Sequence, residues 1–539
     1  MVLQLALPPL SEQTPLDIDL GEAERWIANL PVLNAAESSH HLFTALTGLN
    51  RRTLDDRLRL QLLELYRRPI RIVCAEQQKR YIGLPVPLSH DNRLVAERVR
   101  QFQIELAYGY KRVVVGLSAQ DRREPPPANL RALATQRAIR ALTHILIRSH
   151  ELYMSSPEGT WREIHLLYRH AEADGFVDMP VADELNTVPM NSSVGHAYKQ
   201  ALLFGFCDPN HLPAQLLQKV DQYLDVYAPL AQLSPGAATL QPECQFLVDP
   251  ISDRAGPPVT EAVPAGTESQ YRLLTTGDLV RTMHQQLTVL RNNGQMAPDP
   301  LGDSFYANRG SEILVHLITS WGVHPKRLFP RAPKSAIKAE LVRGIGNIGL
   351  YVNQGVAFVH STTEVGPQPI RGQISGHNPA PASRDAAGTQ AHEIWDLLNE
   401  SAGGFSLTAT GSGEQRMQVG ELLAVRIGEQ KAGRGIAVTR WVRSTETGRI
   451  EFGAQRLAPT AAPIAVAVRD APETRFQPAL QLPEIAPLRQ PQTLITSRGL
   501  FKPERVLILD DGYRTHQIRI VRLVNLTGSF EQFEFSWLD

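Results

Sequence analysis

The sequence predicts a multidomain protein with a mainly α-helical N-terminal half, followed by an antiparallel β-barrel and a further small β segment. Its 539 residues are too many for one compact core, so three or four domains of roughly 150 residues each are expected. Apolar residues recur at helical spacing before Trp321 and in short β-branched runs after it. We therefore divide the chain into residues 1–320, 321–460 and 461–539.

Residues 1–320 contain several amphipathic patterns. Leu54, Leu58 and Leu62 lie four residues apart and share one helix face. Residues 232–269 are instead rich in Pro and Gly, which predicts a linker or loops with a short strand at 244–248. Similar helical spacing, ended by Pro, Gly, Asp or Asn, predicts further helices at 130–154, 161–172, 192–206, 213–227, 276–293 and 310–319.

Residues 321–460 change to short apolar runs separated by turns rich in Gly, Asn and Ser, a pattern typical of a small antiparallel barrel. Residues 362–391 interrupt this pattern, and their composition predicts a mobile surface insertion. Residues 461–539 form either a β module of their own or extra strands on the barrel, with strands at 506–509 and 517–524. The barrel strands are expected at 336–342, 349–352, 356–360, 405–409, 422–427, 436–442 and 450–457.

Composition narrows the function classes. Lys plus Arg and Asp plus Glu both total 55, so the balance does not favour a protein that coats a nucleic acid polymer or an anionic membrane. The 3 cysteines show no CxxC spacing, which indicates unlinked thiols in a reducing compartment. The N-terminus lacks a signal peptide pattern, and no apolar run reaches the roughly 20 residues of a membrane span. We expect a soluble, cytoplasmic protein.

The sequence gives little support for the motifs of common enzymes and metal sites. Residues 344–349 (GIGNIG) match GxGxxG, but the apolar run that follows predicts a second strand, so we interpret them as a hairpin turn. His165 and His170 are five apart on a predicted helix and fall on different faces. No GxSxG or HExxH motif is present. We therefore expect no catalytic residues, no metal site, no cofactor and no enzyme activity.

A basic segment precedes the predicted barrel. The chain carries no acidic residue between Glu312 and Glu340, while arginine and lysine accumulate, so the segment attracts anions. Its prolines favour an extended chain, in which Arg327 and Arg331 project on the same side. Two guanidinium groups there suit phosphates and purine edges. The alternative is a solvated basic linker, because Arg67 repeats the RxxxR spacing in the helical half.

The stretch LLNESAGGFSL contains a second candidate motif, (D/N)xSxxG. Asn399 offers an amide and Ser401 a hydroxyl for hydrogen bonds to a base. Gly403 and Gly404 permit unusual backbone angles and close approach of a flat ligand. The alternative is an ordinary turn between strands, because Asn, Ser and Gly are common turn residues.

RxxxR followed by (D/N)xSxxG at the entrance of a β-barrel resembles the PilZ domain, a family of bacterial cyclic di-GMP receptors. The resemblance extends over residues 321–459 and includes VGELLAVR, GIAVTRWVR and GRIEFGAQRL, which are similar to later PilZ strands. It implies that Arg327 and Arg331 hold phosphate and guanine of cyclic di-GMP. It implies further that Asn399 and Ser401 contact guanine and nearby polar atoms, and that Gly404 shapes the turn. Asn399 stands where the family more often has Asp.

The resemblance implies a cyclic di-GMP receptor in bacterial second-messenger signalling. In this hypothesis the helical half contacts a protein partner or mediates self-association, and the barrel senses the nucleotide. The alternative is a scaffold protein whose barrel binds protein and no nucleotide.

Overall fold

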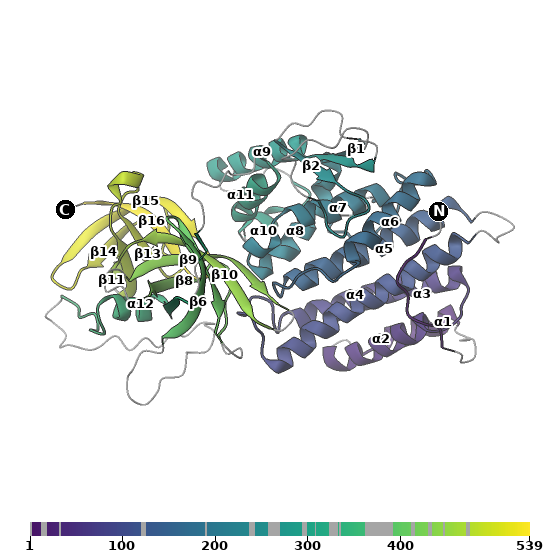
Figure 1. Ribbon diagram of the computed structural model, residues 1–539, viewed down its shortest axis with the longest axis horizontal. Coiled ribbons are helices and arrows are strands. Elements are labelled where there is room, and N and C mark those ends of the chain that lie inside the picture. Colours follow the sequence, from purple (N-terminus) through teal and green to yellow (C-terminus); the bar gives the residue numbers. More distant parts are fainter. Residues whose placement is uncertain are drawn as a thin grey trace. The chain divides into compact units, whose positions relative to one another are not determined.

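The structure is a computed structural model of the chain (Figure 1). It divides into two compact units. The first contains Met1–Gly83, Leu88–Pro209 and Ala214–Lys326, and the second contains Leu84–Pro87, Asn210–Pro213 and Arg327–Asp539. The structure describes residues 3–11, 19–31, 34–119, 126–188, 191–236, 243–256, 270–293, 299–307, 309–322, 332–333, 336–361, 392–410, 415–428, 434–445, 448–469 and 475–538.

The first unit is mainly helical, as predicted. Its core forms around α5, which is buried on nearly every face because α4, α6, α7 and α8 all pack against it. Small residues of α5 such as Ala134 and Ala138 are fully buried, which lets the neighbouring helices approach closely. The helices are α1 (Leu20–Ala28), α2 (Ala35–Asn50), α3 (Asp56–Gln78), α4 (His90–Leu117), α5 (Ala128–His150), α6 (Thr160–Ala173), α7 (Val194–Phe206), α8 (Ala214–Tyr227), α9 (Gly277–Asn293), α10 (Asp303–Ala307) and α11 (Gly310–Trp321).

The Pro/Gly-rich part of this unit contributes a small antiparallel sheet. Strands β1 (Gln232–Pro235), β2 (Gln245–Val248) and β3 (Arg272–Thr275) pair in the order β1-β3-β2. The strand expected near residue 244 is therefore confirmed, while β1 and β3 were not predicted. None of the described helices combines the length and the apolar composition that crossing a membrane requires.

The second unit contains two closed antiparallel barrels of six strands each. In the first barrel the order is β6-β5-β8-β9-β10-β7, with β7 pairing back to β6, and the short β4 pairs with β6 from outside the ring. Its strands are β4 (Ala332–Pro333), β5 (Lys338–Arg343), β6 (Glu393–Ser401), β7 (Gly404–Ala409), β8 (Leu422–Ile427), β9 (Gly435–Ser444) and β10 (Ile450–Ala458).

The C-terminal residues form a closed barrel of their own rather than extra strands on the first barrel. The strand order is β11-β12-β13-β16-β15-β14, and Leu494, Leu507 and Phe533 lie in its interior core. Its strands are β11 (Ala462–Val468), β12 (Gln477–Leu482), β13 (Thr493–Thr496), β14 (Val506–Asp510), β15 (Thr515–Leu526) and β16 (Glu531–Trp537).

The helix α12 (Ile345–Val352) corrects our interpretation of residues 344–349. We predicted a hairpin turn followed by strands at 349–352 and 356–360, and the structure has a helix at the first and no strand at the second. Ile345, Ile348 and Val352 recur at helical spacing and pack into a core that both barrels share. This tertiary burial outweighs the β propensity of the individual residues. The helix follows β5, yet β5 pairs antiparallel with β6 and β8, unlike the parallel strands of a dinucleotide-binding fold.

Candidate functional site

The stretch LLNESAGGFSL closes a tight hairpin between β6 and β7. Ser401 pairs with Gly404 across the end of the hairpin, and the Ser401 hydroxyl donates a hydrogen bond to the Gly404 carbonyl oxygen at 3.2 Å. Ala402 and Gly403 form the tip between them. The row of small residues therefore makes a short turn that leaves the surface beside it open.

A β-bulge in β6 turns the polar residues of the motif outward. Leu397 pairs with the buried Leu407, but the register then shifts, and the next pair is Asn399 with Ser406. Because side chains alternate along a strand, Ser406 faces the opposite side from Leu407, and its partner Asn399 does too. In a regular strand without the bulge, Asn399 would lie on the same inward face as Leu397. The bulge thus places Asn399 and Ser401 on the outer face of the barrel.

Gly404 is required by a close approach between two strands. A Cβ atom built at Gly404 would clash with the carbonyl oxygen of Ala454 in β10. Beside it, the Gly403 carbonyl oxygen accepts a hydrogen bond from the Arg456 backbone amide at 3.1 Å. Since β10 lies this close to the turn, a larger residue at position 404 would push the hairpin away from it.

A second bulge, in β9, brings two further side chains to the same face. Thr439 pairs with Ala454 and Trp441 pairs with Gly453, so Arg440 is the extra residue. The indole of Trp441 lies against Gly453, where any Cβ atom would clash with the indole nitrogen. Because of the bulge, the consecutive residues Arg440 and Trp441 both line one hollow, although consecutive residues of a regular strand face opposite sides.

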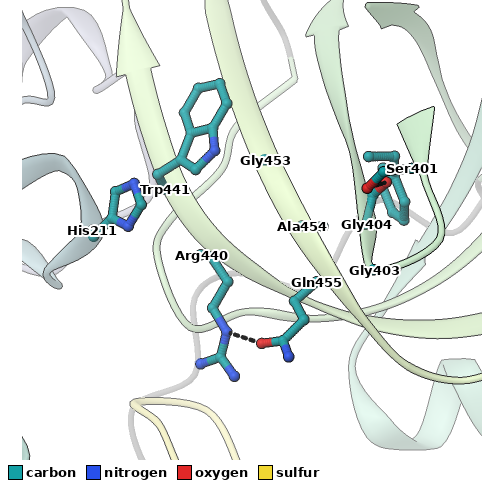
Figure 2. Close-up of a pocket in the computed structure, with 10 residues that line it drawn as sticks. His211, Ser401, Gly403, Gly404, Arg440, Trp441, Gly453, Ala454 and Gln455 are labelled. Atoms are coloured by element: carbon teal, nitrogen blue, oxygen red, sulfur yellow. Dashed lines mark hydrogen bonds between the residues drawn. The ribbon is translucent and has the colours of Figure 1, made fainter. Parts of the chain in front are cut away.

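This hollow has a volume of about 200 Å³ and lies between the turn and the β9 bulge (Figure 2). Ser401 and Gly404 line one side, and Arg440 and Trp441 line the other. His211, from the Asn210–Pro213 segment of the second unit, also contributes. The full lining consists of His211, Ser401, Gly403, Gly404, Phe405, Arg440, Trp441, Gly453, Ala454 and Gln455.

The charge around the hollow suits an anion with a flat ring. None of its described lining residues is a carboxylate. The Arg440 guanidinium is oriented by a 2.7 Å hydrogen bond to the Gln455 side chain, and Arg443 stacks over Trp441 at 5.5 Å from the ring centroid. The nearby carboxylate of Glu400 forms an ion pair with Arg456. Guanidinium groups and an indole face are the usual partners of phosphates and bases.

The basic segment meets the turn at its C-terminal end. Arg327 and Arg331 lie outside the described residues, but β4 begins at Ala332, the next residue after Arg331. Ala332 pairs with Glu400, and Pro333 pairs with Asn399. The chain that leaves the RxxxR motif is thus in register with the (D/N)xSxxG motif.

The second RxxxR match, in the helical half, has a structural role. Arg67 lies on α3 and contacts Asp183 at 2.9 Å, while Arg71 donates to the Leu185 carbonyl oxygen. Arg137 joins the same buried network through Asp183 at 2.7 Å. The two arginines therefore tie the 183–185 loop to α3, and their guanidinium groups already have protein partners.

The histidines singled out in the sequence are packing residues. The ring of His165 is buried between the Tyr198 hydroxyl at 2.6 Å and the Arg254 carbonyl oxygen at 2.9 Å, and burial lowers the pKa of His165. His170 contacts the Ser118 hydroxyl at 2.9 Å. Across the described ranges, no group of three or more His, Cys, Asp or Glu residues is arranged to hold a metal ion.

Of the residues that line the hollow, the sequence motif identified Ser401 and Gly404. It did not identify Arg440, Trp441 and Gln455. The segment GIAVTRWVR was recognised only as a strand. A regular strand would turn Arg440 and Trp441 to opposite sides, and the bulge that brings them together depends on pairing with β10. Asn399 lies on the same strand, two residues before Ser401, and is not among the residues that line the hollow.

Comparison with known protein families shows where the chain belongs. Its residues 360–463 match the family model described as "Cyclic-di-GMP receptor FimW, middle PilZ domain". The chain contains a PilZ domain. Residues 21–238 match the model of the N-terminal domain of the cyclic-di-GMP receptor FimW, and residues 464–538 match that of the FimW C-terminal β-barrel domain. The PilZ match includes the hairpin, both bulges and every lining residue of the hollow except His211, whereas β4, β5 and α12 precede it.

A relative from Pseudomonas aeruginosa, described as "Cyclic-di-GMP receptor FimW", aligns with nearly the whole chain. The two sequences are 29% identical over 586 aligned positions, which cover 99% of this chain and 93% of the relative. No solved structure matches this PilZ-domain chain.

Proposed function

We propose that this protein is a cyclic di-GMP receptor that binds the nucleotide beside the Asn399–Gly404 turn and passes the signal to a protein partner through its helical half. Arg327, Arg331, Asn399, Ser401 and Gly404 contact the ligand. The family match and the relative named as a cyclic-di-GMP receptor support the ligand class. The function requires binding and no chemical step.

The observation that carries the site is the pairing of β4 with β6. Ala332 lies opposite Glu400, and consecutive Cα atoms are about 3.8 Å apart across a trans peptide. Arg331 is therefore bonded to a residue that already lies at the turn. Arg327 precedes Arg331 by four residues in the sequence, and four residues of chain span at most roughly 14 Å. Both arginines can reach a ligand that sits on the turn.

The residues that line the hollow and the two arginines have different roles in binding the nucleotide. The hollow is smaller than the roughly 300–1,000 Å³ of typical small-molecule pockets, so it accommodates one base rather than a whole dinucleotide. Trp441 offers a face on which a guanine stacks, and Ser401 offers a hydroxyl for its edge. Arg331 and Arg327 then grip the phosphates and the second base from the open side.

Two links lead away from the hollow. Arg440 also donates a hydrogen bond to the Asn525 side chain in β15 at 3.1 Å, so an occupant that draws Arg440 inward acts on the second barrel. His211 belongs to the Asn210–Pro213 segment, whose chain neighbours Pro209 and Ala214 belong to the helical unit. A ligand that contacts His211 therefore pulls on a segment covalently joined to α7 and α8. If each link has two conformations, the ratio of the ligand affinities of the two conformations sets how far the nucleotide shifts the equilibrium between them.

Calorimetric titration with cyclic di-GMP tests the proposal. The parent chain is expected to release heat and saturate. Arg327→Ala and Arg331→Ala each remove a charge-assisted contact worth about 2 kcal/mol, so each variant binds about 30-fold more weakly. Arg498→Ala, an exposed arginine of the second barrel, serves as the matched control and binds like the parent.

The same titration distinguishes a cyclic di-GMP receptor from the alternative, a scaffold protein. A scaffold whose barrel binds only protein gives no heat with cyclic di-GMP at any concentration tested. Parent-like binding by both arginine variants would place the nucleotide elsewhere on the molecule.

We keep the expectation of a cytoplasmic location, in which buried thiols such as Cys74 stay reduced.

A further inference from the structure

The N-terminal residues 3–11 (LQLALPPLS) lie as an extended arm across the helical unit. The Ala6 amide donates a hydrogen bond to Glu163 of α6 at 2.6 Å. Arg112 of α4 donates to the Pro8 carbonyl oxygen at 2.5 Å, and the Ser11 amide donates to the carbonyl oxygen of Arg51, at the end of α2, at 2.6 Å. The arm thus passes from α6 over α4 to α2, as the N-terminal trace in Figure 1 also shows.

The helices recognise the backbone of the arm. Each of these contacts uses a main-chain amide or carbonyl group of the arm, so any extended peptide offers the same groups at the same spacing. Side chains add an alternating pattern. Leu3, Leu5 and Leu7 are half-buried against the helices, while Gln4 and Ala6 are exposed. A surface that binds backbone groups and alternate leucines suits an extended peptide.

The arm leaves part of this surface unsatisfied. Burial and the nearby Arg51 guanidinium lower the pKa of Arg112, and residues 3–11 carry no acidic side chain. Arg51 itself already forms an ion pair with Glu105. The Nε atom of Arg112 is buried and has no hydrogen-bond partner among the described residues. A carboxylate on a bound peptide near Pro8 would give the Arg112 guanidinium a charge-assisted partner.

The arm is also held loosely. None of the residues 3–11 is fully buried, and Leu10 is 45% exposed. Backbone hydrogen bonds at an exposed site contribute only about 1 kcal/mol each, so a better ligand can replace the arm. Glu163, the partner of the Ala6 amide, also forms an ion pair with Lys111 of α4 at 2.8 Å, a contact that does not involve the arm.

We propose that the surface formed by α4, α6 and the end of α2 is a binding site for an extended, leucine-rich segment of a partner protein that carries an acidic residue after its leucines. Residues 3–11 occupy this site in the same chain and are displaced when the partner binds. This surface is therefore the place where the helical half binds its target. This inference does not depend on the nucleotide site.

Peptide binding to the chain without residues 1–11 tests the proposal. A fluorescent peptide with the sequence of residues 3–11 is expected to bind the truncated chain saturably, and the intact chain at least tenfold more weakly, because the tethered arm competes at high effective concentration. A peptide with Pro9→Glu binds about fivefold more tightly than the native peptide. A peptide with Leu5→Asp and Leu7→Asp does not bind.

Variants of this surface provide the matched comparison. Arg112→Gln in the truncated chain weakens binding and removes the advantage of the Pro9→Glu peptide. Arg100→Gln, on the same helix and paired with Glu97, leaves both affinities unchanged. The proposal is overturned when the truncated chain binds no peptide, or binds the native and the aspartate peptides equally.

Hydrogen exchange on the intact chain decides the matter even where the truncated chain does not fold. The amides of Ala6 and Ser11 are expected to be protected, and an excess of the Pro9→Glu peptide is expected to speed their exchange. Exchange that the peptide leaves unchanged contradicts displacement. Dimers of the intact chain that disappear on truncation would show that a second copy supplies the occupant, and would overturn the assignment to a partner protein.

Discussion

At the scale of single residues, the proposed nucleotide site depends on which polar group stands at position 399. Asn399 has one acceptor oxygen in its amide, whereas a carboxylate accepts both the N1–H and N2–H donors of a guanine. The β6 bulge turns this side chain to the outer face of the barrel, on the side of Ser401. In a guanine-binding site, the carboxamide is therefore the weaker choice, and the arginines supply more of the affinity.

Asn399→Asp is expected to strengthen cyclic di-GMP binding by about fivefold. The carboxylate adds one charge-assisted hydrogen bond to guanine, and repulsion from the phosphates offsets part of this gain. Calorimetric titration of the variant measures the change. Asn353→Asp, after the last turn of α12, is the matched control and keeps the parent affinity. An Asn399→Asp chain that binds equally or less well would show that position 399 does not contact the base edge.

At the scale of elements, bulges and one short helix shape the second unit. The bulges in β6 and β9 bring Ser401, Arg440 and Trp441 to one face, which regular strands would not do. The helix α12 packs between the barrels, where Ile348 contacts a core that contains Leu480 and Phe530 of the second barrel. Because that core is shared, the two barrels are expected to unfold together.

Ile348→Ala is expected to destabilise both barrels by about 2–4 kcal/mol. Ile348 is fully buried, so its truncation leaves a cavity in the shared core. Urea unfolding followed by intrinsic fluorescence measures the loss. Gly346→Ala is the control in the same helix, because nothing lies within 4 Å of its Cβ position, and it is expected to be neutral or slightly stabilising. Separate transitions for the two barrels in Ile348→Ala, with the C-terminal barrel unaffected, would contradict a shared core.

At the scale of the whole molecule, the helical unit holds ionisable groups in a buried network, while the barrel unit carries the candidate ligand site. Arg137 binds Glu64 and Asp183, and Arg140 binds Asp221 and Asp225. His196 is buried close to Arg140, and burial lowers the pKa of His196. Such groups make the stability of the helical unit dependent on pH.

Acid is expected to weaken the helical unit between about pH 6.5 and pH 4. Burial lowers the pKa of His196 to about 4, whereas an unfolded histidine titrates near 6.5. In this range the unfolded chain binds a proton that the native chain does not, so the free energy of unfolding falls as the pH falls. The loss from His196 alone is roughly 3 kcal/mol. Urea unfolding at pH 7, 6, 5 and 4, followed by helical circular dichroism, measures it.

His196→Gln is expected to remove most of this dependence, because glutamine keeps a polar side chain and binds no proton in that range. A parent chain whose free energy of unfolding stays constant from pH 7 to pH 4 would contradict the burial of neutral histidine. A variant with the full slope of the parent would assign the effect to the other buried histidines, such as His165.

Much of the fold could be predicted because the signals were periodic. Leucine spacing identified α3, and the β-branched runs identified β7, β8, β9 and β10 within a few residues. The prediction for residues 344–352 was wrong, because a short apolar run is compatible with either a strand or a helix until its packing partners are known. The predictions for Arg327, Arg331 and the 362–391 insertion lie outside the described residues.

The amino-acid sequence by itself determined the order of helical half and barrel, the resemblance to the PilZ domain, and the motif residues Asn399, Ser401 and Gly404. These follow from local periodicity and from residues close together in the chain. Only the tertiary structure decided that Arg440 and Trp441 join Ser401, that the C-terminal strands close a second barrel, and that residues 3–11 cover α4. These contacts depend on strand register and on packing between distant segments, and neither is encoded in any single stretch of the chain.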